Sequence, residues 1–428
     1  MPKDYKKLFG SIITAFTLFS LLAVTPLYAV EARNSSLNDS DIESSIEKDY
    51  PLLLWNLKET PQVYGVSAKD LTRVKLLSPV RIVTKDISNT DLTNKEALYV
   101  LHFPMVNNSG KIFAIYTIIK TDNNVNATMG VDFAPLLEKV KNDGTANVVL
   151  IQDENGIFAL SEAGKTLPLN SNTHSAKSDI LSSVTQMSDC PYVFLSLDET
   201  NNTYSIMADQ AIEDFSTEEI ESDTIVGKNK ETFVGAEETT VVDENNTASI
   251  ARASGSSYLS NYPIVDQKVN GTQRGLCWAA TVASMCRFEK PSSYGTLTAK
   301  QVADYMGIGY DSGGTNANAK KALSHYLSSP YSPTTTSVLS DDAIKTVINN
   351  ADPAYMRNKR KTGFWPWSFD YHAVALTGYS FTSRGSTIQI MDPAYEQFKT
   401  ATKSGSNWSF AFGDTTFTWQ DTVRLLYK

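Results

Sequence analysis

Alternating and continuous apolar runs predict several strands and one helix in the first half of the chain. The runs "ALYVLHFPMV" and "KIFAIYTIIK" flank "NNSG", a turn signal that is typical of a β-hairpin. Both alternating faces of the second run are apolar, so we expect it to be a central strand that is covered on both sides. "VVLIQ" and "IFALS" flank "DENG" in the same way, and "FAPLLEKV" is the best helix candidate. These elements predict a mixed α+β domain over residues 33–210.

The apolar pattern after residue 256 is of a different kind. From Cys277 to Met285 the sequence is apolar on almost every face, and its alanines allow close packing, which is typical of a central buried helix. "DYHAVALTGYS" alternates as a strand, and "TIQIMDP" follows it after the polar turn "SRGS". Residues 257–428 are therefore predicted to form a second α+β domain.

The first 32 residues have the pattern of a secretory signal peptide. Three lysines precede an apolar run from Leu8 to Val24, and small residues follow at Ala29 and Ala32. A membrane anchor is the alternative, but an anchor needs about 20 apolar residues. This run is shorter and contains glycine, serine and threonine. We therefore expect export with cleavage, and no transmembrane segment in the mature chain.

Acidic residues concentrate between the two predicted domains. Residues 211–247 contain eleven acidic residues and two lysines, so this stretch alone accounts for the net charge of −9 of the whole chain. It passes into "NNTASIARASGSS", a small and polar sequence of the kind that proteases reach. Residues 211–256 are therefore predicted to be a flexible acidic linker with a maturation cleavage site. The near-neutral remainder has no basic face that would indicate nucleic-acid binding.

The cysteines and histidines do not form the patterns of a disulfide framework or a metal site. The chain has three cysteines, Cys190, Cys277 and Cys286, which is an odd number, and no two of them form a CxxC pair. Its four histidines are scattered along the sequence. We therefore expect no metal and no cofactor. An exported chain of this kind has room for one free, reactive thiol. His102 and His174, in the first domain, are interpreted as core or surface residues.

Cys277 is the cysteine whose position favours chemistry. It lies at the predicted first turn of the buried helix, where unpaired backbone N–H groups and the helix dipole favour a thiolate. The dipole contributes about 0.3–1 kcal/mol, whereas lowering a cysteine pKa from about 8.5 to about 4 needs roughly 6 kcal/mol. Most of this stabilisation must come from a neighbouring imidazolium. Cys286 lies nine residues on, about half a turn out of phase, and is expected to be a small apolar core residue.

The C-terminal strands supply such an imidazole and a group to orient it. His372 stands at the start of one strand, and Asp392 ends the next, where Pro393 stops the ladder. If the two strands pair as a hairpin, Asp392 falls near His372 and can fix its tautomer, which completes a set of nucleophile, base and orienting group. His325 is a rival base. Asp370, on the same strand face as His372, is a rival orienting group.

Three blocks of the second domain resemble those of papain-like cysteine peptidases. "LCWAATVAS", "HAVALTGY" and "IQIMDPAYE" correspond in order and spacing to the Cys-Trp, His-Ala and Asp/Asn-Pro blocks. The compact bacterial branches, the staphopain-like and AvrRpt2-like peptidases, are the most similar, and the resemblance covers about residues 257–428. It implies a papain-like fold with a central helix and an antiparallel β-subdomain. It also implies Cys277 as nucleophile, His372 as general base and acid, and Asp392 as orienting group.

The resemblance further implies a glutamine that donates to the oxyanion hole beside the Cys277 backbone N–H. The family usually has it six residues before the cysteine, where this sequence has Gly271. Gln267, in "PIVDQ", has the spacing of the papain lead-in if "KVNG" is an inserted loop, and Gln273 is the alternative. The gap from Cys277 to His372 is also shorter than in plant-type papains, which suggests a trimmed β-subdomain.

Together these features predict a secreted cysteine endopeptidase, extracellular or at the cell surface, that is made as a zymogen. Its expected partners are protein or peptide substrates and its own N-terminal propeptide, residues 33–210, which would cover the cleft. Two alternatives remain open. The same triad could serve acyl transfer to an amine or cleavage of peptidoglycan amides, or the chain could be a non-catalytic surface-binding module.

Overall fold

The structure is a computed structural model of the chain. It describes residues 37–84, 99–121, 124–145, 147–153, 156–161, 166–168, 192, 194–197, 202–217, 255–328, 330–362, 371–413 and 415–427. Several features singled out in the sequence lie outside the described residues: the predicted signal peptide, most of the predicted linker, His174, Cys190 and Asp370.

The described chain is a mixed α+β structure, as the apolar pattern predicts. Its α-helices and short 3-10 helices are α2 (Asp39–Glu59), η1 (Pro61–Tyr64), η2 (Ala68–Leu71), α3 (Ala134–Asn142), α5 (Thr203–Thr217), α6 (Cys277–Glu289), α7 (Pro291–Tyr294), α8 (Ala299–Met306), α9 (Asn316–Tyr326) and α10 (Asp341–Asn349). The strands of its N-terminal part are β1 (Lys75–Leu76), β2 (Ile82–Thr84), β3 (Val100–Val106), β4 (Ile112–Thr121), β5 (Asn124–Gly130), β6 (Asn147–Asp153), β7 (Gly156–Ser161), β8 (Thr166–Pro168) and β9 (Phe194–Ser196). Those of its C-terminal part are β10 (Gly255–Tyr258), β11 (Lys268–Val269), β12 (Thr272–Gln273), β13 (Tyr331–Ser337), β14 (Ala354–Thr362), β15 (Tyr371–Thr382), β16 (Gly385–Asp392), β17 (Gln397–Ser404), β18 (Asn407–Phe412) and β19 (Thr415–Tyr427).

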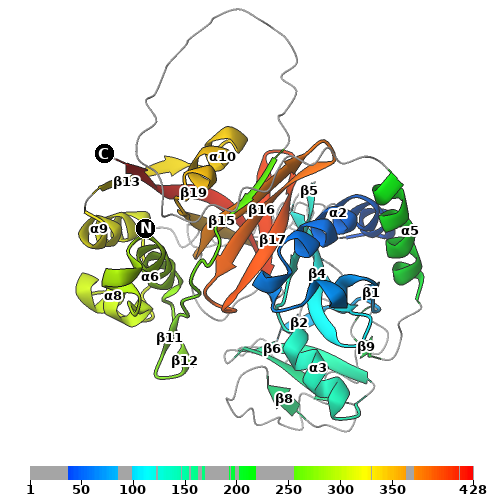
Figure 1. The fold of residues 1–428 in the computed structure, drawn as a ribbon. Helices are drawn as coiled ribbons and strands as arrows, with labels where there is room; N and C mark the ends of the chain where they lie inside the picture. The colour runs from blue at the N-terminus through cyan, green and yellow to red at the C-terminus, as the bar shows by residue number, and fades with distance from the viewer. Residues whose placement is uncertain are drawn as a thin grey trace, which may run out of the picture.

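One sheet of twelve strands runs through both predicted domains (Figure 1). Its main path is β1-β3-β4-β5-β17-β16-β15-β14-β19-β13, and the pairings along it are antiparallel. β5 of the N-terminal part pairs with β17 of the C-terminal part, from Lys399↔Gly130 to Ala401↔Thr128. The sequence predicts two separate domains, whereas the structure joins them edge to edge. An edge strand favours such a contact because its backbone groups on that side need partners.

The strands from β14 to β19 close on themselves. β18 pairs with both β17 and β19, so the path through β17, β16, β15, β14 and β19 returns to its start as a small barrel. Helices α6, α8 and α9 pack together beside this barrel (Figure 1). A central helix next to antiparallel strands is the arrangement that the sequence predicts for residues 257–428.

The N-terminal part contains the two hairpins predicted from its apolar runs. β3 pairs with β4, and β6 pairs with β7, both antiparallel. β4 is buried along its whole length between β3 and β5, as predicted for a covered strand. β6 and β7 belong to a second, five-stranded sheet, in which β2 and β6 run parallel. The helix predicted from "FAPLLEKV" is α3, and it packs against β4 and β7.

Helix α2, of 21 residues, is not predicted from the sequence. Its first turns are polar, and Pro51 lies inside it, where proline usually breaks a helix. The helix forms because Asn38 and Asp41 make a capping box at its start. Its buried face then packs on the sheet, where the Ser45 and Tyr116 hydroxyls lie 2.7 Å apart.

The structure corrects both ends of the predicted linker, residues 211–256. Helix α5 continues to Thr217 because it packs against α2, while Glu213 and Asp214 stay exposed. At the other end, β10 begins at Gly255 and pairs with β15. The acidic composition that predicts a linker therefore belongs, in its first residues, to the exposed face of a helix.

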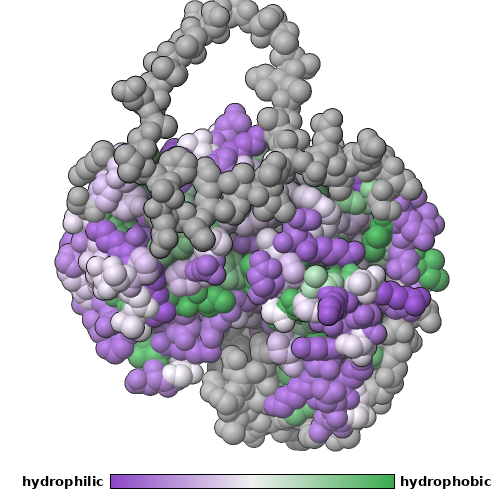
Figure 2. All heavy atoms as spheres, in the orientation of Figure 1, coloured by the Kyte–Doolittle hydropathy of each residue, from purple (hydrophilic) through white to green (hydrophobic). Residues whose placement is uncertain are grey.

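None of the described helices is long and apolar enough to cross a bilayer. On the face drawn in Figure 2, hydrophilic residues cover most of the coloured surface, and hydrophobic residues lie in small groups between them. The large apolar side chains are gathered inside, in clusters between the helices and the sheets.

Candidate active site

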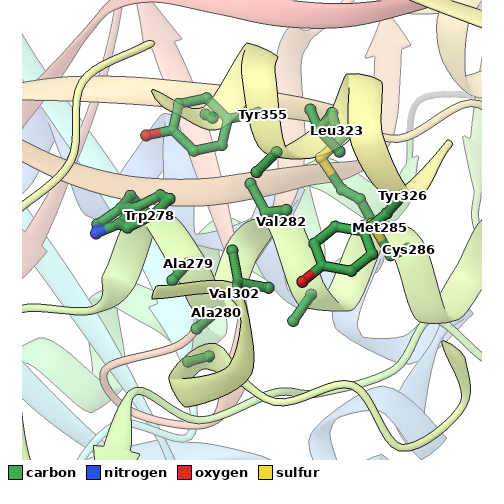
Figure 3. Packing of buried hydrophobic residues seen from close by; sticks show 14 of the residues in the cluster. Trp278, Ala279, Ala280, Val282, Met285, Cys286, Val302, Leu323, Tyr326 and Tyr355 are labelled. Atoms are coloured by element: carbon green, nitrogen blue, oxygen red, sulfur yellow. The ribbon is translucent and has the colours of Figure 1, made fainter. Parts of the chain in front are cut away.

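Cys277 is the first residue of α6, which is the position that the sequence predicts. The helix behind it is buried on nearly all sides, and Figure 3 shows Trp278, Val282 and Met285 packed among neighbouring side chains. Cys277 itself is only partly buried, whereas Cys286 lies fully inside the cluster. Burial raises the pKa of the Cys286 thiol, so this cysteine is a small apolar core residue, as expected.

One hairpin brings His372 and Asp392 together. His372 is the second residue of β15, Asp392 is the last residue of β16, and the two strands pair antiparallel. Asp392 Oδ1 accepts from His372 Nε2 at 2.9 Å and from the Ala394 N–H at 3.0 Å. Cys277 is a side-chain hydrogen-bond partner of the same imidazole. The structure thus brings the three predicted residues into contact.

The imidazole of His372 is held in its charged form. Burial of the ring lowers its pKa, but the charge and hydrogen bond of Asp392, followed by Cys277, outweigh burial and raise the pKa to about 10. Burial likewise raises the pKa of Asp392, yet the charge of His372, their hydrogen bond and the charge of Lys399 bring that pKa below its usual value. His372 and Asp392 therefore form an imidazolium–carboxylate pair at neutral pH.

A cavity of about 260 Å³ opens beside Cys277 and His372. Its walls come from the start of α6, from the loop before α9 and from β14 and β15. The side chains that shape it include Trp278, Tyr355, Arg357, Tyr371 and Ala373. Its lining residues all follow residue 255, so within the described chain the N-terminal part does not reach into this cavity.

Arg357 brings little net charge to the cavity, because Asp421 neutralises it. Arg357 Nε donates to both carboxylate oxygens of Asp421, at 3.0 and 3.1 Å, and Nη2 donates to Oδ2. The guanidinium also lies over the Tyr371 ring, 4.5 Å from its centre. Three aromatic side chains thus form part of the cavity wall, beside glycine backbone and the Ser312 and Thr315 side chains. The aromatic part of this lining suits an apolar side chain.

The two candidate glutamines lie close to the site, and their side-chain amides donate to backbone carbonyls. Gln267 Nε2 donates to the Arg274 carbonyl at 2.7 Å, and Gln273 Nε2 donates to the Ala394 carbonyl at 2.8 Å. Neither glutamine is among the residues that line the cavity.

The chain after Gln267 folds into a short hairpin. β11 and β12 pair as a tight hairpin whose turn residues, Asn270 and Gly271, both have positive φ. The hairpin returns the chain to Arg274, three residues before Cys277. Gln267 is thus held beside the lead-in to α6 although it lies ten residues earlier in the sequence.

His325, the rival base, lies away from the site. His325 is exposed at the end of α9, where its ring stacks on Tyr305 with 3.8 Å between ring centres. His102 is a buried residue of β3 whose Nδ1 lies 3.0 Å from the Thr117 hydroxyl, which fits the predicted core role. Asp370 lies outside the described residues.

Lys399 is a neighbour of the site that the sequence does not indicate. It lies on β17, is 1% exposed, and its Nζ is 3.9 Å from Asp392 Oδ2. A lysine within "QFKTATKS" has the pattern of an ordinary half-exposed strand, and lysine is rarely buried. Lys399 is buried because β17 pairs with both β5 and β16. The sequence around Lys399 carries no signal that predicts this pairing.

The C-terminal part is similar to a known family. Residues 259–422 match the model of the Peptidase_C39 like family. This stretch contains Cys277, His372 and Asp392, and the match points to a cysteine peptidase at the level of the family. The N-terminal part lies outside the match.

The other comparisons add little. No curated protein matches the chain. One similar solved structure is digestive procathepsin L 3 of the Tenebrio molitor larval midgut, with 11% sequence identity and a TM-score of 0.22. The similarity covers 37% of this chain and 65% of that chain.

Proposed function

We propose that this protein is a secreted cysteine endopeptidase that is made as a precursor and hydrolyses peptide bonds through a thioester. One observation carries the proposal: Cys277, His372 and Asp392 are joined by hydrogen bonds beside a cavity. The match of residues 259–422 to a peptidase family supports the same chemistry. The aromatic lining of the cavity favours substrates with an apolar side chain near the scissile bond.

The reaction follows from how the imidazole is held. Asp392 engages His372 Nε2, so Nδ1 is the ring nitrogen left to face the thiol of Cys277. With the proton on the imidazole, the sulfur attacks the substrate carbonyl carbon as a thiolate. The C–N bond breaks as His372 gives its proton to the leaving amine, and a thioester remains. Water then attacks the thioester carbonyl carbon while His372 accepts a proton from it. The C–S bond breaks, which releases the acid and restores the thiolate–imidazolium pair.

The tetrahedral intermediate needs donors for its oxyanion. The backbone N–H of Cys277 is one, because the first N–H groups of a helix have no partner within it. We assign the second donor to Gln267, since the β11–β12 hairpin holds it beside the chain that leads into α6. Alanine variants of Gln267 and Gln273 separate the two candidates, because only the true donor lowers kcat by about 100-fold or more.

The N-terminal part is proposed to be the propeptide. Its position between the predicted signal peptide and residue 255, together with the acidic stretch that follows it, supports this role. The sequence predicts a propeptide that covers the cleft. Its described residues instead attach along β17, outside the lining of the cavity. The pairing of β5 with β17 supports a proposal in which the shared sheet takes part in the control of the precursor.

Digestion assays distinguish peptidase activity from the alternatives. The secreted protein is incubated with an unfolded protein substrate and, separately, with purified cell wall, beside the Cys277→Ala variant. Cleavage of the unfolded protein that is lost in Cys277→Ala supports the proposal. Cleavage of cell wall alone would show a peptidoglycan amidase, and no thiol-dependent turnover with either substrate would leave a binding module.

Precursor control has its own test. N-terminal sequencing of the secreted form shows whether the chain up to about residue 256 is removed. A full-length chain that carries Ala253→Pro and Ser254→Pro, and that is confirmed to be uncut, is then assayed against the processed form. Equal rates would contradict the proposed inhibition.

A further inference from the structure

Lys399 is a buried cation between two carboxylates. The residue is 1% exposed, and its ammonium donates to the Ala411 carbonyl at 2.7 Å. Nζ lies 2.6 Å from Asp132 Oδ1 and 3.9 Å from Asp392 Oδ2. An ammonium in the interior needs such partners, because an unpaired buried charge is costly. One of these partners belongs to the candidate active site, and the other belongs to the N-terminal part.

The two oxygens of Asp392 have different surroundings. Oδ1 accepts from His372 and from the Ala394 N–H. Oδ2 is buried and has no hydrogen-bond partner among the described residues. Lys399 is the cation that faces this second oxygen. Its ammonium is therefore placed to stabilise the carboxylate through the oxygen that His372 leaves free.

Asp132 reaches Lys399 because β5 approaches β17 closely. Gly130, the last residue of β5, is in register with Lys399, and a Cβ there would lie 2.8 Å from Lys399 Cγ. Only glycine lets the two strands come this near. Gln397 then fixes Asp132: the Asp132 N–H donates to Gln397 Oε1, and Gln397 Nε2 donates to Asp132 Oδ1 at 3.3 Å.

We propose that Lys399 is a positioning residue for Asp392. In the precursor, Asp132 of the N-terminal part competes with Asp392 for the ammonium of Lys399. The inference rests on the proposed function, in which Asp392 orients His372. While the N-terminal part is attached, the ammonium is held at Asp132 and only approaches Asp392. When that part is lost, the ammonium moves to the free oxygen of Asp392. The N-terminal part thus changes the electrostatic surroundings of Asp392, and through it of His372, by way of the shared sheet.

The other titratable groups around Lys399 do not replace these carboxylates. Tyr395 presents its ring 4.7 Å from Nζ. His102 faces Lys399 from β3 as a neutral ring, because burial and then the Lys399 charge lower its pKa to about 3. Burial raises the pKa of Asp132, and the charge of Lys399 opposes this rise.

Within the part of the chain that the structure describes, Cys277 on α6 and Asp392 on β16 are the titratable groups that shift the pKa of His372. Phe410 and Phe417, on β18 and β19, contact it without charge. A change in the charge balance at Lys399 should therefore be visible in the titration of His372.

The experiment titrates His372 by NMR in the uncut chain. The chain carries Cys277→Ala, which prevents self-processing, and ¹³C-labelled histidine, which gives four imidazole signals, of which His372→Gln assigns one. Asp132→Asn leaves Asp392 as the carboxylate that faces Lys399. The ammonium then competes with the imidazolium for the charge of Asp392, which should lower the pKa of His372 by roughly 1 pH unit. Lys399→Met should raise that pKa by a similar amount, and the double variant should return it close to the starting value.

Lys403→Met is the matched control, because Lys403 lies on the same strand and pairs with Asp341 instead. It should leave the pKa of His372 unchanged. If Lys399→Met fails to fold, Asp132→Asn keeps the size of the side chain and tests the inference alone. An unmoved pKa in Asp132→Asn, or an equal shift in Lys403→Met, would overturn the inference. The readout needs no turnover, so a chain that shows these shifts but cleaves no substrate would contradict only the proposed function.

Discussion

Two buried histidines lie in the two halves of one sheet, and their surroundings give them opposite properties. His102, on β3, is 3% exposed, and His372, on β15, is 7% exposed. Burial, followed by the charge of Lys399, lowers the pKa of His102 to about 3. Burial acts in the same direction on His372, but Asp392 and then Cys277 overcome it and raise the pKa to about 10. The rings are hidden from water to a similar degree, so burial does not explain the difference.

The partners of the two rings explain it. His102 Nδ1 lies 3.0 Å from the neutral hydroxyl of Thr117, and its ring meets Phe133 edge-on at 5.1 Å between centres. His372 has a carboxylate at 2.9 Å and a thiol as a second hydrogen-bond partner. A buried imidazole with neutral partners is a core residue, whereas the same ring between an acid and a thiol can hold a proton and transfer it. Variants that remove these partners one at a time test whether they set the properties of each ring.

Removing the thiol should have the largest effect. Cys277→Ala is expected to abolish turnover and labelling by thiol-directed epoxides, because it deletes the atom that attacks the substrate. Substrate cleavage, mass spectrometry of the labelled protein and circular dichroism check this, with the fold expected to be unchanged. Cys286→Ala on the same helix is the control, and it should keep its activity because Cys286 lies in the core. Activity in Cys277→Ala would point to another nucleophile.

Removing the carboxylate should have the next largest effect. Asp392→Ala is expected to lower kcat by roughly 10²–10⁴-fold. Only Cys277 then opposes the effect of burial on the pKa of His372, so the ring loses its proton at a lower pH. The alkaline limb of the activity profile should move to lower pH. Asp392→Asn keeps an oxygen that can accept from Nε2, so it should be milder if Asp392 only orients the ring. Equal losses in both variants would show that the charge itself is required.

The residues of the candidate site can be predicted from the sequence, whereas the surroundings of Lys399 cannot. Cys277 and His372 are predictable because each stands where a change in apolar pattern marks the start of an element. Asp392 is predictable because Pro393 ends its strand and the polar turn before it indicates a hairpin. In each case the signal lies within about 20 residues of the site, a range over which periodicity and turn chemistry act.

The surroundings of Lys399 depend on residues that are much farther away along the sequence. Its burial depends on the pairing of β17 with β5, two strands from opposite halves of the chain, and neither strand carries a local signal for the other. Helix α2 is missed for a related reason, since packing on the sheet overrides the effect of Pro51. The boundary at Thr217 is missed because an exposed helix face and a linker share the same acidic composition.

The two histidines should also limit stability at opposite ends of the pH range. His372 binds its proton more tightly in the folded chain, so its contribution is complete below about 6.5 and is lost as the pH rises through about 10. His102 binds its proton more weakly in the folded chain, so its contribution is complete above about 6.5 and falls as the pH drops toward about 3.

A variant of His102 isolates the acid side of this difference. Between pH 6.5 and 4.5, His102 should cost the folded chain about 2–3 kcal/mol of unfolding free energy. His102→Gln cannot be protonated, so this part of the acid loss should disappear while activity at neutral pH is retained. Denaturant unfolding at both pH values measures it, and subtraction of the parent curve removes the contribution of the other titratable groups. An unchanged acid slope would mean that His102 is already protonated in the folded chain.

The smallest expected effect comes from the neutral partner of His102. Thr117→Val removes the hydroxyl beside Nδ1 and should lower the unfolding free energy by about 1–2 kcal/mol at neutral pH, because a buried ring nitrogen loses its hydrogen bond. Thr128→Val is the matched control, since Thr128 is the buried register partner of Thr117 on β5 and undergoes the same change of atoms. Equal losses in the two variants would assign the effect to the loss of a strand hydroxyl in general. A loss confined to Thr117→Val, with kcat unchanged, would place His102 in the core as firmly as the Asp392 variants would place His372 in the active site.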